Sequence, residues 1–95
     1  MRDYEIMAIL DPEADEQTVA GVVDRITQIL SDREGEVANV DRWGRRKLAY
    51  EINRKSEGNY VLVVFKSDPE ALAELDRVLN LADEVIRFKI IRKAA

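Results

Sequence analysis

The spacing of apolar residues in the first third of the chain predicts a strand followed by a helix. Residues 4–10 are apolar at alternate positions and then almost continuously, and Asp11-Pro12 ends this strand because proline lacks a backbone donor. From about Asp15 to Asp32 the apolar residues recur at helical spacing. They form one stripe of Val19, Val22, Val23, Ile26, Ile29 and Leu30. Gly35 suits the left-handed position that follows a helix.

The middle of the chain has the pattern of a hairpin. A second strand is predicted from Glu36, with a bulge or bend at Gly44. The apolar side chains of this strand share one parity, which predicts that they lie on one face. They are Ala38, Val40, Leu48, Tyr50 and Ile52. Residues 53–58 are predicted to form a polar hairpin loop, and residues 60–65, which are apolar throughout, a central strand buried on both faces.

The last third of the chain repeats the order of helix and strand. Asp68 as the cap and Pro69 at the first helical position predict a second helix. Its buried stripe contains Leu72, Leu75 and Leu79. Residues 84–92 then alternate between apolar and polar, which predicts a last strand with Ile86, Phe88 and Ile90 on one face.

The element order, βαββαβ, predicts an α+β fold of the ferredoxin-like type in a single domain of residues 1–95. Right-handed crossovers place the first and third strands in the centre of a four-stranded antiparallel sheet, with the second and fourth at its edges. Both helices cover one face. We expect this face to carry Ile6, Ala8, Leu10, Val61, Val63, Phe65, Ile86, Phe88 and Ile90. The open face then carries Met7, Ile9, Tyr60, Leu62, Val64, Arg87, Lys89 and Ile91.

Composition excludes most catalytic chemistry. The 95 residues include no Cys and no His, which removes thiol nucleophiles, thiolate metal sites and the commonest general base. The acidic residues lack the spacing of a calcium-binding loop. We therefore expect no catalytic residue, no metal site, no cofactor and no small-molecule substrate. The apolar run near the N-terminus is too short for a membrane span or a signal peptide, so a cytoplasmic protein is expected.

The net charge of −4 hides a strong segregation of charge along the chain. Residues 1–41 carry a net charge of −8 and residues 56–83 a net charge of −4, whereas residues 42–55 carry +5 and residues 84–95 carry +3. The two basic segments coincide with the predicted edge strands. One interpretation is that charged edges prevent aggregation between sheets. The other is a bipartite surface that contacts phosphates from an otherwise acidic body.

Aromatic residues distinguish two ways in which the open face could bind. Tyr60 is the only aromatic residue expected there, so stacking of RNA bases is not predicted. An aliphatic patch rimmed by Arg and Lys fits a protein partner better. Trp43 is either a satellite core residue under the bent strand or an anchor for a partner.

Residues 40–52 carry a specific pattern: a glycine, a basic pair, and then Leu-Ala-Tyr-x-Ile. This segment resembles the signature of the bacterial small-subunit ribosomal protein six family. Further similarities to the family span essentially the whole chain. They are found at Met1–Glu5, Gly58–Tyr60, Glu74–Arg77, Leu79-Asn80, Val85–Arg87 and Ile90–Arg92. One difference is that no acidic tail follows Lys93-Ala94-Ala95.

The resemblance implies a non-catalytic, ferredoxin-like protein of the ribosome. Such a protein joins small-subunit ribosomal protein eighteen and binds with it to the central domain of 16S ribosomal RNA. By similarity, the RNA contacts are expected from Arg2, Arg45, Arg46, Arg87 and Arg92. The partner-facing or RNA-proximal side is expected to include Tyr4, Tyr60 and Leu62, and the partner-facing side also Lys89 and Ile91.

A different class of function also fits the predicted fold. A ferredoxin-like regulatory domain could use its sheet face or its strand edges to form a homodimer that binds a small effector. That alternative predicts a symmetric dimer in solution and no association with ribosomes.

Overall fold

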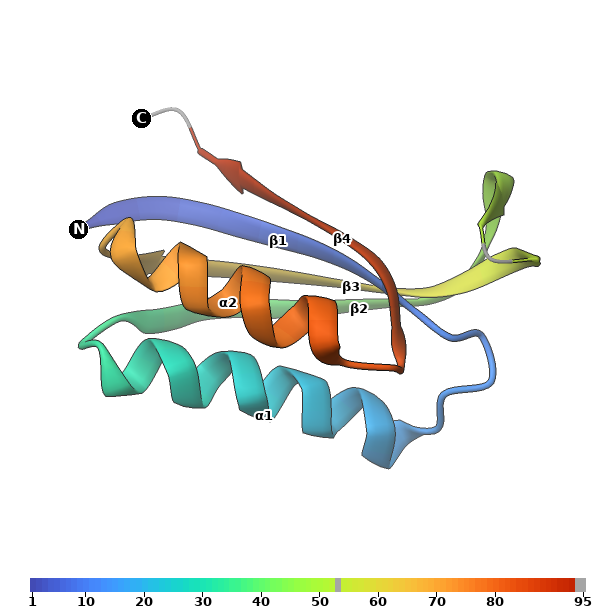
Figure 1. Cartoon of the computed structure of the whole chain (residues 1–95), viewed down its shortest axis with the longest axis horizontal. Helices are drawn as coiled ribbons and strands as arrows, with labels where there is room; N and C mark the ends of the chain where they lie inside the picture. Colours follow the sequence, from blue (N-terminus) through green and yellow to red (C-terminus); the bar gives the residue numbers. More distant parts are fainter. Residues whose placement is uncertain (53, 94–95) are drawn as a thin grey trace.

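A computed structural model describes residues 1–52 and 54–93, and its elements follow the predicted order (Figure 1). They are β1 (Arg2–Leu10), α1 (Glu16–Asp32), β2 (Glu36–Ile52), β3 (Lys55–Ser67), α2 (Glu70–Leu81) and β4 (Val85–Arg92). The strands form one antiparallel sheet in the order β2-β3-β1-β4, and both helices lie on the same face of it. The ferredoxin-like α+β prediction is confirmed, with β1 and β3 central and β2 and β4 at the edges.

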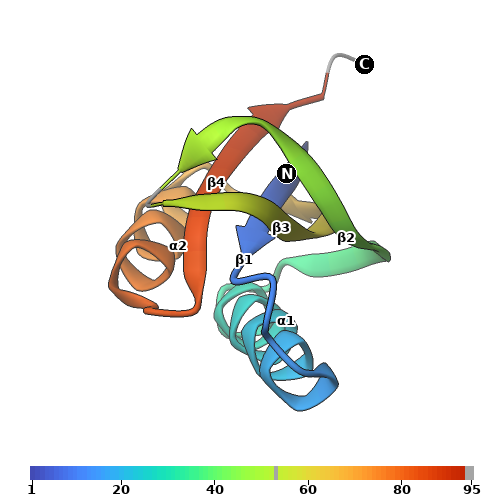
Figure 2. The ribbon, with the colours of Figure 1, turned by 90° about the vertical axis from the view of Figure 1, so that its right-hand side faces the viewer.

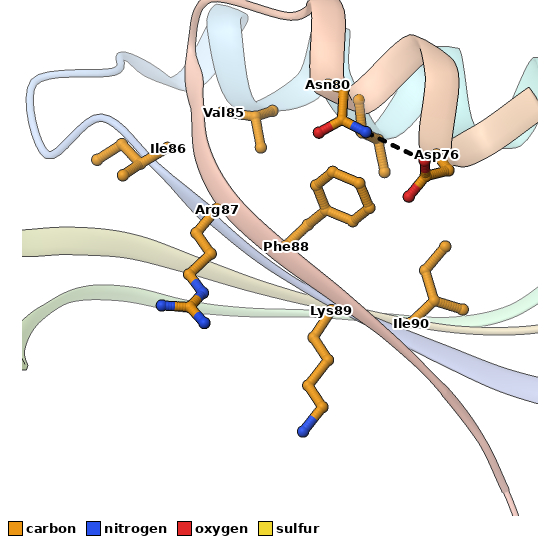
Figure 3. A pocket seen from close by; sticks show the side chains of 9 residues that line it. Asp76, Asn80, Val85, Ile86, Arg87, Phe88, Lys89 and Ile90 are labelled. Atoms are coloured by element: carbon orange, nitrogen blue, oxygen red, sulfur yellow. Dashed lines mark hydrogen bonds between the residues drawn. The ribbon is translucent and has the colours of Figure 1, made fainter. Parts of the chain in front are cut away.

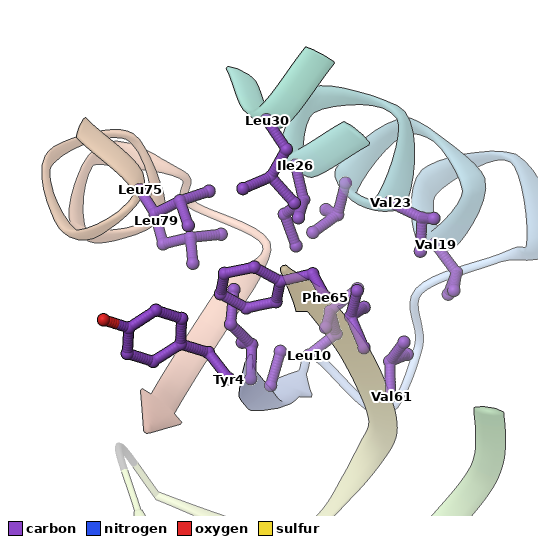
Figure 4. Packing of buried hydrophobic residues seen from close by; sticks show 14 of the residues in the cluster. Tyr4, Leu10, Val19, Val23, Ile26, Leu30, Val61, Phe65, Leu75 and Leu79 are labelled. Atoms are coloured by element: carbon purple, nitrogen blue, oxygen red, sulfur yellow. The ribbon is translucent and has the colours of Figure 1, made fainter. Parts of the chain in front are cut away.

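The core lies between the two central strands and the two helices. Alternate residues of β1 and β3 point into it because side chains of a strand alternate between the two faces. Figure 4 shows the Phe65 ring near the Tyr4 ring, which it meets with a centroid separation of 5.6 Å. The predicted core residues of these two strands are all buried. They are Ile6, Ala8, Leu10, Val61, Val63 and Phe65.

In β4 the predicted inward face is correct for Phe88 and Ile90 but wrong for Ile86. The register of β4 against β1 shifts near its start, where Ile9 pairs with Arg87 and Leu10 pairs with Val85. Ile86 is therefore the extra residue of a bulge, and Val85 packs against the core in its place.

The prediction of a single apolar face for β2 is also wrong. The pairing of β2 with β3 shifts between Val37 and Asn39 and again between Arg42 and Gly44. Each extra residue exchanges the faces of all side chains that follow it. As a result Val37 and Val40 pack against the core, whereas Ala38 and Tyr50 are exposed.

The hairpin between β2 and β3 is longer and more strongly bent than the sequence predicts. Lys47 pairs with Glu57 and Ile52 pairs with Lys55, so residues 48–51 of β2 lie opposite Ser56 alone. The predicted loop over residues 53–58 is therefore wrong for Lys55 to Gly58, which belong to β3, while Asn53 lies outside the described residues. Because β2 is the longer side of this hairpin, it arches across the open face (Figure 2).

The N-terminus of α1 has the side-chain cap that is typical of helices, whereas the N-terminus of α2 lacks the cap predicted from Asp68. Asp15 caps α1, where its side chain accepts a hydrogen bond of 2.8 Å from the Thr18 amide, and this bond holds the pKa of Asp15 below its ordinary value. At α2, no side-chain hydrogen bond caps the N-terminus, and Asp68 instead accepts from the Ala71 amide through its backbone carbonyl.

Gly35 is required by close packing and not by a left-handed backbone. The positive φ after α1 belongs to Glu34, at 61°, which corrects the prediction for Gly35. A Cβ atom on Gly35 would lie 2.7 Å from the backbone oxygen of Lys66 and 3.1 Å from the Cβ of Ser67. The turn after α1 therefore packs directly on the end of β3.

The substitution Gly35→Ala is expected to reduce the free energy of unfolding by roughly 1–3 kcal/mol, because backbone atoms must move to admit the methyl group. Gly21→Ala is the matched control, since Gly21 lies within α1 and its Cβ would meet nothing within 4 Å. That variant is expected to gain about 0.5–1 kcal/mol from helix propensity. Urea denaturation measures both values, and an equal gain for the two variants would contradict the packing of Gly35.

Candidate functional site

The open face of the sheet consists of rows of side chains that cross the strands from one edge to the other. One row joins Tyr60, Ile9 and Arg87, and the next joins Leu62, Met7 and Lys89. A third row joins Val64, Glu5 and Ile91. Four of the residues predicted to face a partner therefore share this surface: Tyr60, Leu62, Lys89 and Ile91. The prediction is wrong for Tyr4, because its side chain leaves β1 on the helical side and is buried in the core.

The arch of β2 brings the two edge strands together at one end of this face. The Arg87 guanidinium of β4 donates a hydrogen bond of 2.7 Å to the hydroxyl of Tyr50 in β2, although the two residues are 37 positions apart. Leu48, two residues before Tyr50 in β2, is buried on the same face as Ile9. A cavity of about 160 Å³ remains there, lined by Ile9, Leu48, Ala49, Tyr50, Ile52, Tyr60 and Arg87.

Two further aromatic side chains join Tyr60 on the open face, which corrects the expectation of only one. The Trp43 ring is nearly parallel to the Tyr60 ring, with a centroid separation of 6.1 Å and an angle of 7°. Trp43 is 40% exposed and is therefore not a core residue under the strand. Tyr50 is the other addition. The bulge at Trp43, beside the Gly44 position where the sequence predicts one, and the arch of β2 place both residues here.

Arg45 and Arg46 are adjacent in the sequence but have different surroundings. The Arg46 guanidinium lies 5.4 Å from the centroid of the Trp43 ring. Arg45 points to the opposite side of β2, where its Nη2 atom lies 3.0 Å from Glu13 and its Nε atom lies 3.2 Å from Glu57. Arg46 is thus held by an uncharged ring, whereas Arg45 is paired with two carboxylates.

Acidic residues of the loop between β1 and α1, and of the first turn of α1, neutralise further cations of β2 and β3. The Nζ atom of Lys55 lies 3.2 Å from Asp11, and Arg42 forms an ion pair with Glu16. A hydrogen bond from the Glu13 amide, together with Lys55, holds the pKa of Asp11 below its ordinary value. These pairs lie on the side of β2 that faces away from Arg46.

The five predicted RNA-contacting arginines do not form one cluster. Arg46 and Arg87 lie on the open face near the hairpin, and Arg45 lies behind them. Arg2 and Arg92 are exposed at the opposite end of the sheet, near the two termini (Figure 1). By register, both of their side chains leave the strands on the side of the helices, as Tyr4 does.

A groove of about 550 Å³ lies between α2 and the edge strand β4 (Figure 3). Phe88 and Ile90 point toward the helix, while Arg87 and Lys89 point to the other side of the strand. On the helical wall, the Asn80 side chain donates to Asp76 with a distance of 3.1 Å. The alternation of β4 therefore directs Arg87 and Lys89 to the open face, and Phe88 and Ile90 to this groove.

Two further features bear on the expected class of protein. In residues 1–52 and 54–93, no group of three or more acidic side chains is arranged to hold a metal ion. Within the same residues, no helix is long and apolar enough to cross a membrane.

Known proteins with similar sequences and structures identify the family. The family described as "Ribosomal protein S6" matches residues 3–92. The small ribosomal subunit protein bS6 of Micrococcus luteus is 51% identical over 97% of this chain and 91% of its own. That of Beutenbergia cavernae is 50% identical over 100% of this chain and 99% of its own.

Solved structures agree with this assignment. The crystal structure of 30S ribosomal protein S6 from Thermotoga maritima superposes with a TM-score of 0.88 at 35% identity, covering 97% of this chain and 87% of that one. The P2 domain of a chemotaxis kinase from the same organism has a TM-score of 0.61 at 18% identity, which shows a shared fold alone.

These matches cover nearly the whole chain, and they confirm both the family predicted from the signature and its location in the ribosome. The family is one of ribosomal structural proteins and not a class of enzymes. The chain belongs to the ribosomal protein S6 family, whose members are proteins of the small ribosomal subunit.

Proposed function

We propose that this chain is a structural subunit that binds the central domain of 16S ribosomal RNA together with small-subunit ribosomal protein eighteen. The observation that carries the proposal is the composition of the open face near the hairpin. Arg46 and Arg87 flank an apolar strip there, and neither of them has a carboxylate within 4.0 Å among the described residues. Such cations are available to phosphates.

The distribution of charge favours one orientation of the chain on RNA. Residues 12–34, which contain α1, and residues 68–80, which contain α2 except for Leu81, carry net charges of −4 and −3. A polyanion is repelled from that side and attracted to the open face and its basic edges. The total charge of −4 weakens the binding of the isolated chain, which supports a requirement for a partner.

The apolar strip on the open face suits a protein partner. Met7, Ile9, Leu62 and Val64 remain half-buried because nothing within residues 1–52 and 54–93 covers them fully. Apolar side chains surrounded by polar ones are typical of protein interfaces. We therefore assign the strip, with Tyr60, Lys89 and Ile91, to the ribosomal partner, and the cations near the hairpin to RNA. The family assignment favours this function over an effector-binding homodimer.

Binding of the chain and its partner to a transcript of the 16S central domain is expected to be strongly salt-dependent. With about two to four phosphates contacted by this chain, the affinity falls roughly 10- to 100-fold between about 50 and 200 mM salt, because condensed counterions are released. Filter binding or fluorescence titration at the two salt concentrations measures this change. An affinity that is equal at both concentrations would refute electrostatic docking.

The two adjacent arginines of the signature are expected to contribute unequally. Arg46→Gln should weaken RNA binding about three- to tenfold and reduce the salt slope by about one, because the guanidinium on Trp43 is free for a phosphate. Arg45→Gln should weaken it by less than about threefold, because Glu13 and Glu57 already neutralise this cation. Arg77→Gln on α2 serves as the control. A larger loss for Arg45→Gln than for Arg46→Gln would contradict this ranking.

A further inference from the structure

We propose that Tyr50 is a positioning residue for RNA binding. Its hydroxyl holds the Arg87 guanidinium beside the arch of β2, so that cations from the two edge strands act as one surface. This inference rests on the proposed function, because it assumes that Arg87 contacts RNA. It assigns a role to a side chain that is not itself expected to contact a phosphate.

The first support is the distance that the contact spans across the sheet. β2 and β4 are separated by β3 and β1, so their backbones in a flat sheet would be roughly 14 Å apart. The Tyr50 hydroxyl nevertheless lies 2.7 Å from the Nη1 atom of Arg87. The surplus residues 48–51 allow this approach, because they carry the end of β2 over the open face.

The second support is that the partner of Arg87 is neutral. A guanidinium has five N–H donors, and the tyrosine hydroxyl occupies one of them while leaving the positive charge in place. Arg45 differs, since its two partners, Glu13 and Glu57, are anions. Fixing a long side chain before binding also reduces the conformational entropy that is lost when a phosphate is bound. Tyr50 therefore orders Arg87 without neutralising it.

The third support is that the arch does not depend on the hydroxyl alone. A Cβ atom on Gly58 would collide with the Cγ2 atom of Ile9 and lie 3.5 Å from the Cδ2 atom of Leu48, so the missing side chain leaves room for both at this position. Leu48 is buried at this position and anchors the arch through apolar contact. Tyr50 itself is 62% exposed, so removal of its hydroxyl leaves no buried polar group without a partner. Tyr50→Phe therefore tests positioning without unfolding the hairpin.

A double-mutant cycle tests the proposal with the full chain, its ribosomal partner and a 16S central-domain transcript. Tyr50→Phe is expected to weaken RNA binding roughly two- to fivefold, and Arg87→Gln roughly three- to tenfold. The double variant should bind no more weakly than Arg87→Gln alone, because Tyr50 acts through Arg87. Arg77→Gln is the matched control for the loss of one positive charge.

A second measurement follows the contact in the absence of RNA. Nitrogen relaxation of the Arg87 guanidinium is expected to report a restricted side chain in the parent protein and a mobile one in Tyr50→Phe, at unchanged melting temperature. Additive losses in the double-mutant cycle would overturn the positioning role, as would an unchanged affinity of Tyr50→Phe.

The cycle also separates this inference from the function on which it rests. If Arg87→Gln weakens binding but Tyr50→Phe does not, the positioning role is wrong and the proposed function stands. If Arg46→Gln, Arg87→Gln and Arg77→Gln all bind like the parent protein, both the proposed RNA surface and the role of Tyr50 are wrong.

Discussion

The unequal lengths of β2 and β3 are the constraint on which the rest of this structure depends. The 16 residues of β2 from Val37 to Ile52 lie opposite only 11 residues of β3, from Lys55 to Phe65. β2 must therefore bulge and bend while it stays paired with β3. Its first part packs Val37 and Val40 against the core, and its last part turns Leu48 and Tyr50 to the opposite face. The arch that results is why two edge strands meet at one end of the sheet.

This constraint also separates what could be predicted from the sequence from what could not. The faces of β1 and β3 follow from alternation, because their mutual register runs without interruption from Arg2 to Leu10. Alternation fails for β2 and for Ile86, since a bulge reverses every side chain after it and, apart from Gly44, no residue type marks the bulges of this chain. The contact of Tyr50 with Arg87 depends on the surplus residues of the hairpin, and the sequence therefore contained no sign of it.

The segregation of charge could be predicted from the sequence, but the availability of each cation could not. Counting by segment identifies two basic strands on an acidic body, and the topology places both at sheet edges. The sequence cannot rank the cations, because their availability depends on side-chain neighbours. Glu13 and Glu57 pair with Arg45, whereas an aromatic ring supports Arg46 and a hydroxyl supports Arg87. The net charge therefore does not locate the RNA-binding surface, whereas the neighbours of each guanidinium show which cations are available to a phosphate.

The central claim is that both edge strands meet one RNA surface, and directed hydroxyl-radical cleavage tests it most directly. The chain contains no cysteine, so a single one can carry an iron chelate at Glu51→Cys in β2, at Ile86→Cys in β4, or at Asp24→Cys on α1 as a control. In complexes with the ribosomal partner and the 16S central domain, the probes at positions 51 and 86 are predicted to cleave overlapping nucleotides, and the probe at position 24 is predicted to leave those nucleotides intact. Cleavage of separate RNA segments from positions 51 and 86, or of the same segment from position 24, would contradict the account.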